Sequence, residues 1–488
     1  MRLVVFHYHD RPGGVRQVIS RGLPRLVERL GRVAEVILLM GEMTDPDWVK
    51  GLEVSLAGVP LRVVTHRELG YLSGRDQALG GEAVERVQEL LSGQDVLVWA
   101  HNLSVGRNVP LLRHLPDWCA SAGARLWLHH HDWWWDGRWA RWADWQASGI
   151  ADLEEALELS IPTGPHLRHW CVNQADLAWL QTRAGASARW VGNPLPELAY
   201  PDKSEVHAAR AWLQSLTQGR RLWLAPVRAL RRKNLAEALL LAQQQDEPTC
   251  LVTTGGPSSP AEVPPWEALC AAAARHHWPL VPAVLAQGAR ICNPPRWPGL
   301  SSIPSLTAIL SASDAIAMPS LQEGFGLPYL EAAALEKPLL ARALPDVSAN
   351  LNALGCALPG TYNKLPVAPG SFNAARESIR LAGRWALLRS SLPEILRMDL
   401  EPIQTVEGTD FGCLSLEAQM EVLQSSARLP GSLPEPQVPF LPAESREDHW
   451  ADRFFQAPAG SPLPSGGSLL AEVRRRFHYW QQHPLLWP

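Results

Sequence analysis

Cysteine is scarce in this chain, with seven in 488 residues and no two of them arranged as a CxxC pair. Secreted domains that depend on disulfides are far richer in cysteine, and zinc fingers need paired cysteines at short spacing. We therefore expect a reducing compartment, no disulfide framework and no cysteine-based zinc site.

Long hydrophobic runs are also missing. The first apolar run, residues 2–6 (RLVVF), is followed at once by His7, His9 and Asp10. This pattern is typical of a first β-strand and not of a signal peptide. No run approaches the roughly 20 apolar residues that cross a bilayer. The expected location is the cytoplasm, without a transmembrane segment.

Neither sign of charge is in large excess, because 45 Lys and Arg face 49 Asp and Glu for a formal net charge of −4. Proteins that bind nucleic acids or anionic membranes non-specifically are usually basic, so we expect neither partner. Tryptophan, by contrast, is abundant, with 22 residues. The Trp133–Trp135 run and Trp139 fit either core packing or stacking on sugar rings.

The length of the chain predicts two domains. Short apolar segments alternate with helical ones, a rhythm that indicates an α/β fold with doubly wound parallel sheets. The strand candidates are residues 2–6, 32–40, 95–100, 125–129, 168–173, 221–225, 249–256 and 314–318. Pro194 and Pro196 favour an extended crossover, which places the domain boundary near residues 190–200.

The C-terminal part differs from this rhythm. Residues 429–442 contain five prolines, which predicts a semi-rigid extended segment. Residues 468–482 (SLLAEVRRRFHYWQQ) have the pattern of an amphipathic helix, on which we expect Arg474–Arg476 to form a solvated face.

The most informative stretch is residues 318–331 (MPSLQEGFGLPYLE). It follows a strand candidate and opens a helix with Pro328 in the first turn, where proline is well tolerated. Gly324 and Gly326 between them allow the backbone to approach a ligand closely. A strand, a glycine loop and a helix N-terminus together offer free N–H groups and a positive dipole end to an anion.

The string E-G-F-G-L-P-x-x-E in this stretch resembles the signature of the retaining nucleotide-sugar glycosyltransferases of family 4, which have the GT-B fold. The resemblance implies that Glu331 holds the ribose hydroxyls of the nucleotide. It also implies that Glu323, near the reacting face, holds the donor sugar together with the loop amides. The loop residues are Gly324, Phe325, Gly326 and Leu327.

A basic loop, PVRALRRKN, lies between the strand candidate at 221–225 and a helix that begins near Leu235. Cations beside a helix N-terminus suit a diphosphate, although a solvated basic loop has the same composition. The loop resembles the R-x-x-x-x-K-N diphosphate clamp of the same family, which assigns Arg228 and Lys233 to donor binding and catalysis. Arg231 and Arg232 are expected to be solvated neighbours, and either can take the place of Arg228.

Pro12, Gly13 and Gly14 form a turn after the first strand candidate, where open α/β sheets bind phosphates. By the resemblance, Gly13 and Gly14 pack against the nucleotide diphosphate and the donor sugar.

Histidines follow two strand candidates, at His101 and at 129–131. A metal site at 129–131 is disfavoured because adjacent residues rarely point to one ion. A loop without chemistry is a second interpretation. The resemblance implies a third, a histidine that reaches the donor sugar. His131, followed by Asp132, best matches the family's His-Asp pair, while His129, His130 and His101 remain alternatives for this catalytic position.

We expect no metal and no cofactor besides the donor substrate. Asp45-Pro-Asp47 resembles a metal-binding D-x-D but lies outside the expected site. The cations and dipoles around the diphosphate can replace a divalent ion.

Together these features predict two Rossmann-like doubly wound domains with an interdomain cleft, the GT-B arrangement. Residues 1–192 form the acceptor side, residues 193–400 bind the nucleotide sugar, and the helix of residues 401–488 packs back on the first domain. The expected activity is retaining transfer of a hexose to an acceptor hydroxyl of a carbohydrate or small polar molecule. Alternatives are another GT-B enzyme, an epimerase or a phosphorylase, or a non-catalytic carbohydrate-binding protein.

Overall fold

The structure is a computed structural model that describes residues 1–11, 13–72, 78–93, 95–195, 200–285, 304–398, 409–425, 427–442, 450–455 and 468–487. Of the sequence predictions, Pro12, Pro196 and the start of the C-terminal part at 401–408 lie outside these residues.

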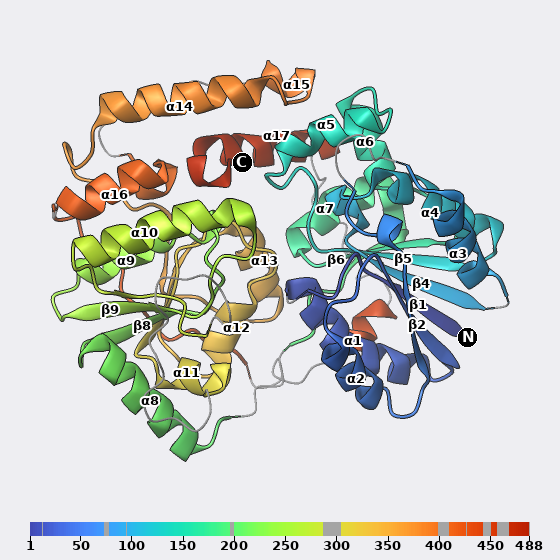
Figure 1. The fold of residues 1–488 in the computed structure, drawn as a ribbon, viewed down its shortest axis with the longest axis horizontal. Coiled ribbons are helices and arrows are strands. Elements are labelled where there is room, and N and C mark those ends of the chain that lie inside the picture. The colour runs from blue at the N-terminus through green and yellow to red at the C-terminus, as the bar shows by residue number, and fades with distance from the viewer. Residues whose placement is uncertain are drawn as a thin grey trace.

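Seven parallel strands form the first sheet, in the order β3-β2-β1-β4-β5-β6-β7 (Figure 1). Successive side chains of a strand point to opposite faces, so each face of the sheet has its own core. Leu3 and Val5 of β1 belong to one core, and Val4 and Phe6 to the other. The strands are β1 (Arg2–Phe6), β2 (Glu35–Met40), β3 (Leu61–Thr65), β4 (Val96–His101), β5 (Arg125–His130), β6 (Leu167–Cys171) and β7 (Ala188–Trp190).

Helices cover both faces of this sheet, as expected for parallel strands that are buried on both sides. Two of them, α1 (Gly14–Leu30) and α2 (Pro46–Ser55), pack on the face of Leu3 and Val5. The opposite face carries α3 (Gly81–Leu91), α4 (Val109–Ser121), α5 (Trp142–Ala147), α6 (Leu153–Ser160) and α7 (Gln174–Ala184).

Six parallel strands form the second sheet, in the order β10-β9-β8-β11-β12-β13. They are β8 (Arg221–Ala225), β9 (Thr249–Thr253), β10 (Leu280–Val281), β11 (Ala315–Met318), β12 (Leu339–Arg342) and β13 (Thr361–Tyr362). The helices of this half are α8 (Lys203–Thr217), α9 (Leu235–Gln243), α10 (Val263–Arg275), α11 (Leu306–Ala312), α12 (Leu327–Ala334) and α13 (Pro345–Ala353). The predicted fold class, two doubly wound parallel α/β sheets, is therefore confirmed.

Helix α7 of the first half lies beside α13 of the second (Figure 1), and buried polar contacts join them. The side chain of Asn350 donates to Oδ1 of Asn173 at 2.7 Å, and the amide of Gln174 donates to Oδ1 of Asn350 at 2.6 Å. Because buried amide groups need partners, this pairing fixes one relative position of the two sheets.

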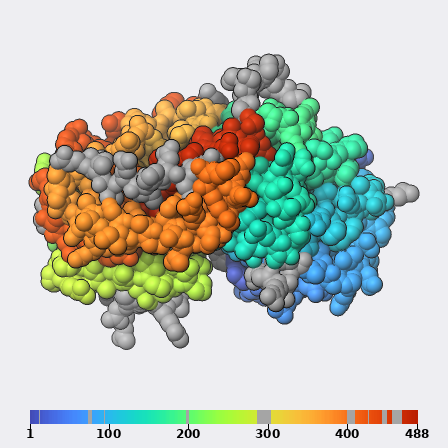
Figure 2. All heavy atoms as spheres, turned by 90° about the horizontal axis from the view of Figure 1, so that it is seen from above, coloured from blue at the N-terminus to red at the C-terminus, as the bar shows by residue number. Residues whose placement is uncertain are grey.

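The C-terminal part crosses from the second half back to the first, as its orange-to-red band shows in Figure 2. Its helices are α14 (Ala374–Arg389), α15 (Glu394–Arg397), α16 (Leu416–Ser425) and α17 (Leu469–Gln482). The proline-rich segment is extended and forms antiparallel bridges to the second half, from Gln437 to Leu339 and from Phe440 to Ala357.

Arg476 of α17 was predicted to be exposed to solvent, and this prediction is wrong. Arg476 is buried, and its guanidinium pairs with Asp136 and Asp176 of the first half. The reason is that α17 turns its amphipathic face toward α7, which brings one of the three arginines inward while Arg475 stays about half exposed.

The burial of the tryptophans after β5 decides between the two predicted roles, core packing and stacking on sugar rings. Trp133, Trp134, Trp135 and Trp139 are all fully buried. The indole N–H of Trp133 donates to Asp176 at 2.9 Å and that of Trp134 to Ser160 at 3.0 Å. They therefore pack the core and do not line an acceptor cleft.

Within the described residues, no helix has both the length and the apolar character needed to span a membrane.

Candidate active site

The loop after β11 leads through Glu323 and Gly324 to the N-terminus of α12. Gly326, just before α12, has a positive φ of 98°, and a Cβ there would meet Cγ1 of Val347 at 2.7 Å, so only glycine fits. A Cβ on Gly324 would meet nothing. The backbone N–H groups of Gly324, Phe325 and Gly326 donate to no described residue. Open space and free amides at a helix N-terminus are what an anionic ligand requires.

Glu323 lies at the centre of a charged cluster. Lys233 donates to both of its carboxylate oxygens, the hydroxyl of Ser320 donates to Oε1 at 2.6 Å, and Arg232 lies 3.8 Å from Oε2. Burial raises the pKa of Glu323, but Lys233 and Arg232 outweigh burial and hold the pKa below its usual value. Glu323 is thus an ionised carboxylate in a largely dry site.

Lys233 lies in the loop before α9, and its side chain is buried. Burial lowers its pKa to about 8, Glu323 opposes that shift, and the positive charges of Arg232 and Arg228 add to it. A lysine in such surroundings gains from any further negative charge that binds nearby.

Arg228 and Arg232 complete the basic side of the cluster. Arg228 donates to the hydroxyl of Ser258 at 3.2 Å, and Arg232 donates to the backbone carbonyl of Gln322 at 2.6 Å. Burial and the charge of Arg232 lower the pKa of Arg228, while Asp132 and Glu323 raise it. Arg232 is therefore part of the site rather than a solvated neighbour. The side chain of Arg231 points elsewhere: Nε lies 3.5 Å from Oε2 of Glu262, and Nη1 donates to the backbone carbonyl of Trp487 at 2.6 Å.

Glu331 lies on α12 and is largely buried. Burial raises the pKa of its carboxyl group, and Arg21 of α1 lowers it. Its carboxylate accepts no hydrogen bond from another described residue and forms no ion pair with one. The side chain is partly exposed, so the carboxylate of Glu331 is available to accept hydrogen bonds from a ligand.

The first half contributes Asp132, at the end of β5. Arg138 lies 3.3 Å from its carboxylate. Burial raises the pKa of Asp132, but Arg138 and then Arg232 hold it below its usual value. Asp132, in the first half, therefore interacts electrostatically with Arg232 and Arg228 of the second half.

The hydrogen bond and the ring contacts of His131 lie within the first half. Its ring is buried, and Nε2 lies 3.0 Å from Nδ1 of His101. Burial lowers the pKa of His131 to about 4, so its ring is neutral near pH 7. Of the residues after β5, it is Asp132 that faces the basic loop.

Gly13 and Gly14 precede and begin α1, and neither would bring a Cβ into collision with another residue. The same helix carries Arg21, which acts on Glu331, so α1 faces α12 of the second half. The D-x-D motif has a structural use: Asp45 caps α2 and pairs with Arg16 at 2.7 Å.

The structure thus brings Glu323, Lys233 and Arg228 into one cluster, with Glu331 on the adjoining helix. Sequence reasoning left out Ser320, named Asp132 only as the neighbour of His131 in the His-Asp pair, and listed Arg232 only as a substitute. Ser320 carries no distinguishing sequence pattern. Asp132 had a signal, because it follows a predicted strand beside a histidine, where open sheets place their sites.

No family model matches the chain. Among curated proteins it is similar to mannosylglucosyl-3-phosphoglycerate synthase of Petrotoga mobilis, with 22% identity over 445 residues, which are 88% of this chain and 82% of that protein.

Among solved structures, the fold is similar to Alr3699/HepE of Anabaena in complex with UDP-glucose. The TM-score is 0.51 and the identity 14%, over 88% of this chain and 95% of the other. The complex of the same protein with UDP and glucose gives a TM-score of 0.51 and 13% identity, over 74% and 85% of the two chains. The chain therefore has the GT-B fold that its sequence predicted.

Proposed function

We propose that the protein is a retaining glycosyltransferase that moves a hexose from a nucleoside diphosphate sugar to an acceptor hydroxyl. The observation that carries this proposal is the charged cluster on the loops before α9 and α12. Arg228, Arg232 and Lys233 face Glu323, so three cations oppose one carboxylate. On these two loops the positive charges outnumber the negative one, beside three backbone amides that donate to no described residue, which suits a diphosphate.

The two glutamates have different surroundings and therefore different roles. Glu331 has no donor of its own, and the hydroxyls of a ribose would supply two. Glu323 is held in place by Lys233 and Ser320, which suits a carboxylate that stabilises positive charge developing on the sugar. Gly13 and Gly14 leave room for the diphosphate on the opposite side of the cleft.

The main catalytic effect is electrostatic. As the bond between sugar and diphosphate breaks, negative charge grows on the leaving diphosphate. Arg228, Lys233, the loop amides and the positive end of α12 are already oriented toward it and need no reorganisation. No metal ion is needed at the phosphates. In a front-face reaction of this kind we assign no general base.

The relatives suggest which substrates to test first. HepE was solved with UDP-glucose, so UDP-glucose is the first donor. The Petrotoga protein is named for a product that contains 3-phosphoglycerate, so a sugar that carries phosphoglycerate is the first acceptor.

Calorimetric titration with UDP and GDP tests the donor site. We expect a saturable binding event that Arg228→Ala weakens and that the exposed Arg220→Ala does not. Equal affinity in wild type and Arg228→Ala would remove the basis of the proposal.

A further inference from the structure

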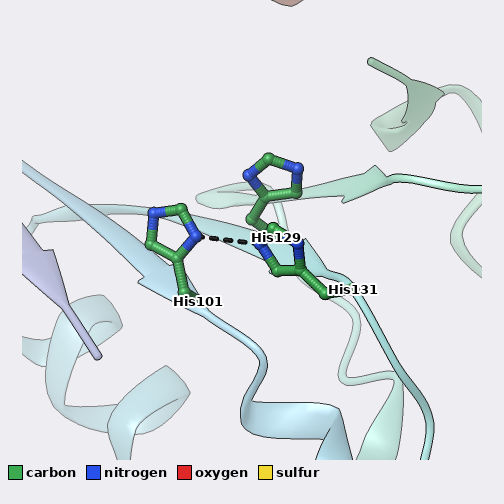
Figure 3. A group of neighbouring side chains, drawn as sticks. All are labelled: His101, His129 and His131. Carbon is green, nitrogen blue, oxygen red and sulfur yellow. Dashed lines mark hydrogen bonds between the residues drawn. The ribbon is translucent and has the colours of Figure 1, made fainter. Parts of the chain in front are cut away.

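Three histidines that the proposed reaction does not use converge at the carboxyl edge of the first sheet. His101 ends β4, and His129 and His131 lie at the end of β5 and just after it (Figure 3). Strand register explains their meeting. His101 is paired directly with His129, and residues two apart on a strand point to the same face. His130 points to the other face, where Nε2 lies 2.9 Å from Nδ1 of His169.

The three rings are buried and short of hydrogen-bond partners. The only pairing among them joins Nδ1 of His101 to Nε2 of His131, at 3.0 Å. Nε2 of His101 and both ring nitrogens of His129 have no partner among the described residues. Each unpaired buried nitrogen costs free energy, and no neighbouring carboxylate or hydroxyl of the described chain relieves this cost.

A transition-metal ion would relieve it. One nitrogen from each of the three histidines can be chosen so that all lie within 4.8 Å of one another. Zn–N bonds of 2.0–2.1 Å place tetrahedral ligands about 3.3 Å apart, close to the spacing of His101 and His131. His129 can contribute either nitrogen, because neither is bound elsewhere.

We propose that His101, His129 and His131 bind a divalent transition-metal ion, with the ligand preference of Zn²⁺, that ties the end of β4 to the end of β5. With three protein ligands, a water molecule would take the fourth position of a tetrahedral site. This site is separate from the diphosphate cluster. It holds the segment that ends in Asp132, so the side chain of His131 serves the metal and Asp132 faces the donor.

A second group, Asp410, Cys413 and His483, also has three ligand atoms close together. It is a weaker candidate because Asp410 is already occupied: it accepts hydrogen bonds from both terminal nitrogens of Arg342, at 2.8 and 2.6 Å. Only the second group contains a thiol, so spectroscopy can distinguish metal bound there from metal bound to the three histidines.

The test is a titration of chelator-treated full-length protein with Co²⁺, without nucleotide, followed by displacement with Zn²⁺. We expect one equivalent of Co²⁺ with the visible absorption of a tetrahedral site and no thiolate-to-cobalt band. His101→Gln and His129→Gln should each weaken binding at least tenfold, whereas the exposed control His276→Gln should not. Saturating UDP should leave the titration unchanged.

Absence of Co²⁺ and Zn²⁺ binding to the wild type would overturn the proposal, as would a thiolate band or unchanged binding in both glutamine variants. If a variant does not fold, X-ray absorption of the Zn²⁺-loaded wild type decides instead. Three imidazole nitrogens without sulfur support the site, and any other ligand set refutes it. None of these results depends on whether the protein transfers sugars.

Discussion

Lys233 donates hydrogen bonds to both carboxylate oxygens of Glu323, with 2.6 Å between Nζ and Oε2. The pair joins the loop before α9 to the loop before α12, two segments that lie 90 residues apart in the chain. It therefore sets the position of the glutamate before any donor binds. Burial, and after it the charges of Arg232 and Arg228, lower the pKa of Lys233 and so make its positive charge less favourable. A diphosphate that binds beside Lys233 would therefore stabilise this charge.

Arg228→Ala should weaken binding of a nucleoside diphosphate by about 10- to 100-fold. Hydrogen bonds to charged groups contribute roughly 1.5–3 kcal/mol each, and about 1.4 kcal/mol corresponds to a factor of ten. Lys233→Ala should have a similar effect and also destabilise the fold, since Glu323 loses its partner. Calorimetry measures both, with the exposed Lys203→Ala as the control for Lys233. Unchanged affinity in both variants would show that the diphosphate binds elsewhere.

Glu331→Gln and Glu323→Gln should differ in what they impair. Glu331→Gln should weaken the donor and the free nucleotide alike, because a ribose contact is present in both. Glu323→Gln should leave nucleotide affinity nearly intact while turnover falls, since an interaction made mainly in the transition state shows in the rate. Glutamine keeps the shape and removes only the charge. Equal losses of nucleotide affinity in the two variants would refute this division of roles.

Turnover should not depend on Mg²⁺ or Mn²⁺. The cations around the diphosphate already supply the charge that such an ion would bring. Initial rates with and without these ions, in otherwise identical buffer, measure this. A rate that requires either ion would place a metal at the phosphates.

Arg476→Met should destabilise the protein strongly, by about 3–5 kcal/mol, because it leaves Asp136 and Asp176 buried without their partner. The neighbouring Arg475 is half exposed, so Arg475→Met should cost at most about 1 kcal/mol. Urea unfolding of the two variants provides the comparison. Similar losses in both would mean that α17 is not anchored through Arg476.

The stability should fall with acid partly through His483. Burial lowers the pKa of His483 to about 4, whereas an exposed imidazole has a pKa of about 6.5. Between these values the unfolded chain binds a proton that the folded chain does not, so stability present above about pH 6.5 is lost as the pH falls toward about 4.

His483→Gln should therefore show a shallower decline, by at most about 1.4 kcal/mol per pH unit for the single proton. Urea unfolding at several pH values measures the slope, with His276→Gln as an exposed control. Parallel slopes for wild type and His483→Gln would contradict this assignment.

The sequence predicted those parts of the molecule that depend on local patterns. The alternation of strands and helices led to the correct fold class. The strand, loop and helix from β11 to α12 could be predicted because glycine and Pro328 occur there for local conformational reasons: glycine allows a tight turn, and proline is favoured in the first turn of a helix. The sequence could not decide whether the tryptophans after β5 are buried or exposed, since core packing and stacking on sugars both use an indole ring.

What remained hidden depends on which elements meet in space. Arg476 turned out to be buried because α17 crosses to α7, and no local pattern reports that contact. Asp132 and Arg232 influence each other across two sheets. The histidine cluster was only partly predictable from the sequence. Three adjacent histidines do not all point to one face, as expected, but residues two apart on β5 share a face. Because β4 pairs with β5, His101 joins His129 and His131 on that face.

The central claim is that this cleft cleaves the bond between a sugar and a nucleoside diphosphate. The most direct test measures release of nucleoside diphosphate from a panel of UDP-, GDP- and ADP-sugars, with and without sugar acceptors, for the wild type and Glu323→Gln. We predict that the wild type releases nucleoside diphosphate from at least one donor, that an acceptor accelerates the release, and that the variant is much slower. No release from any donor, or equal release by the variant, would contradict the claim.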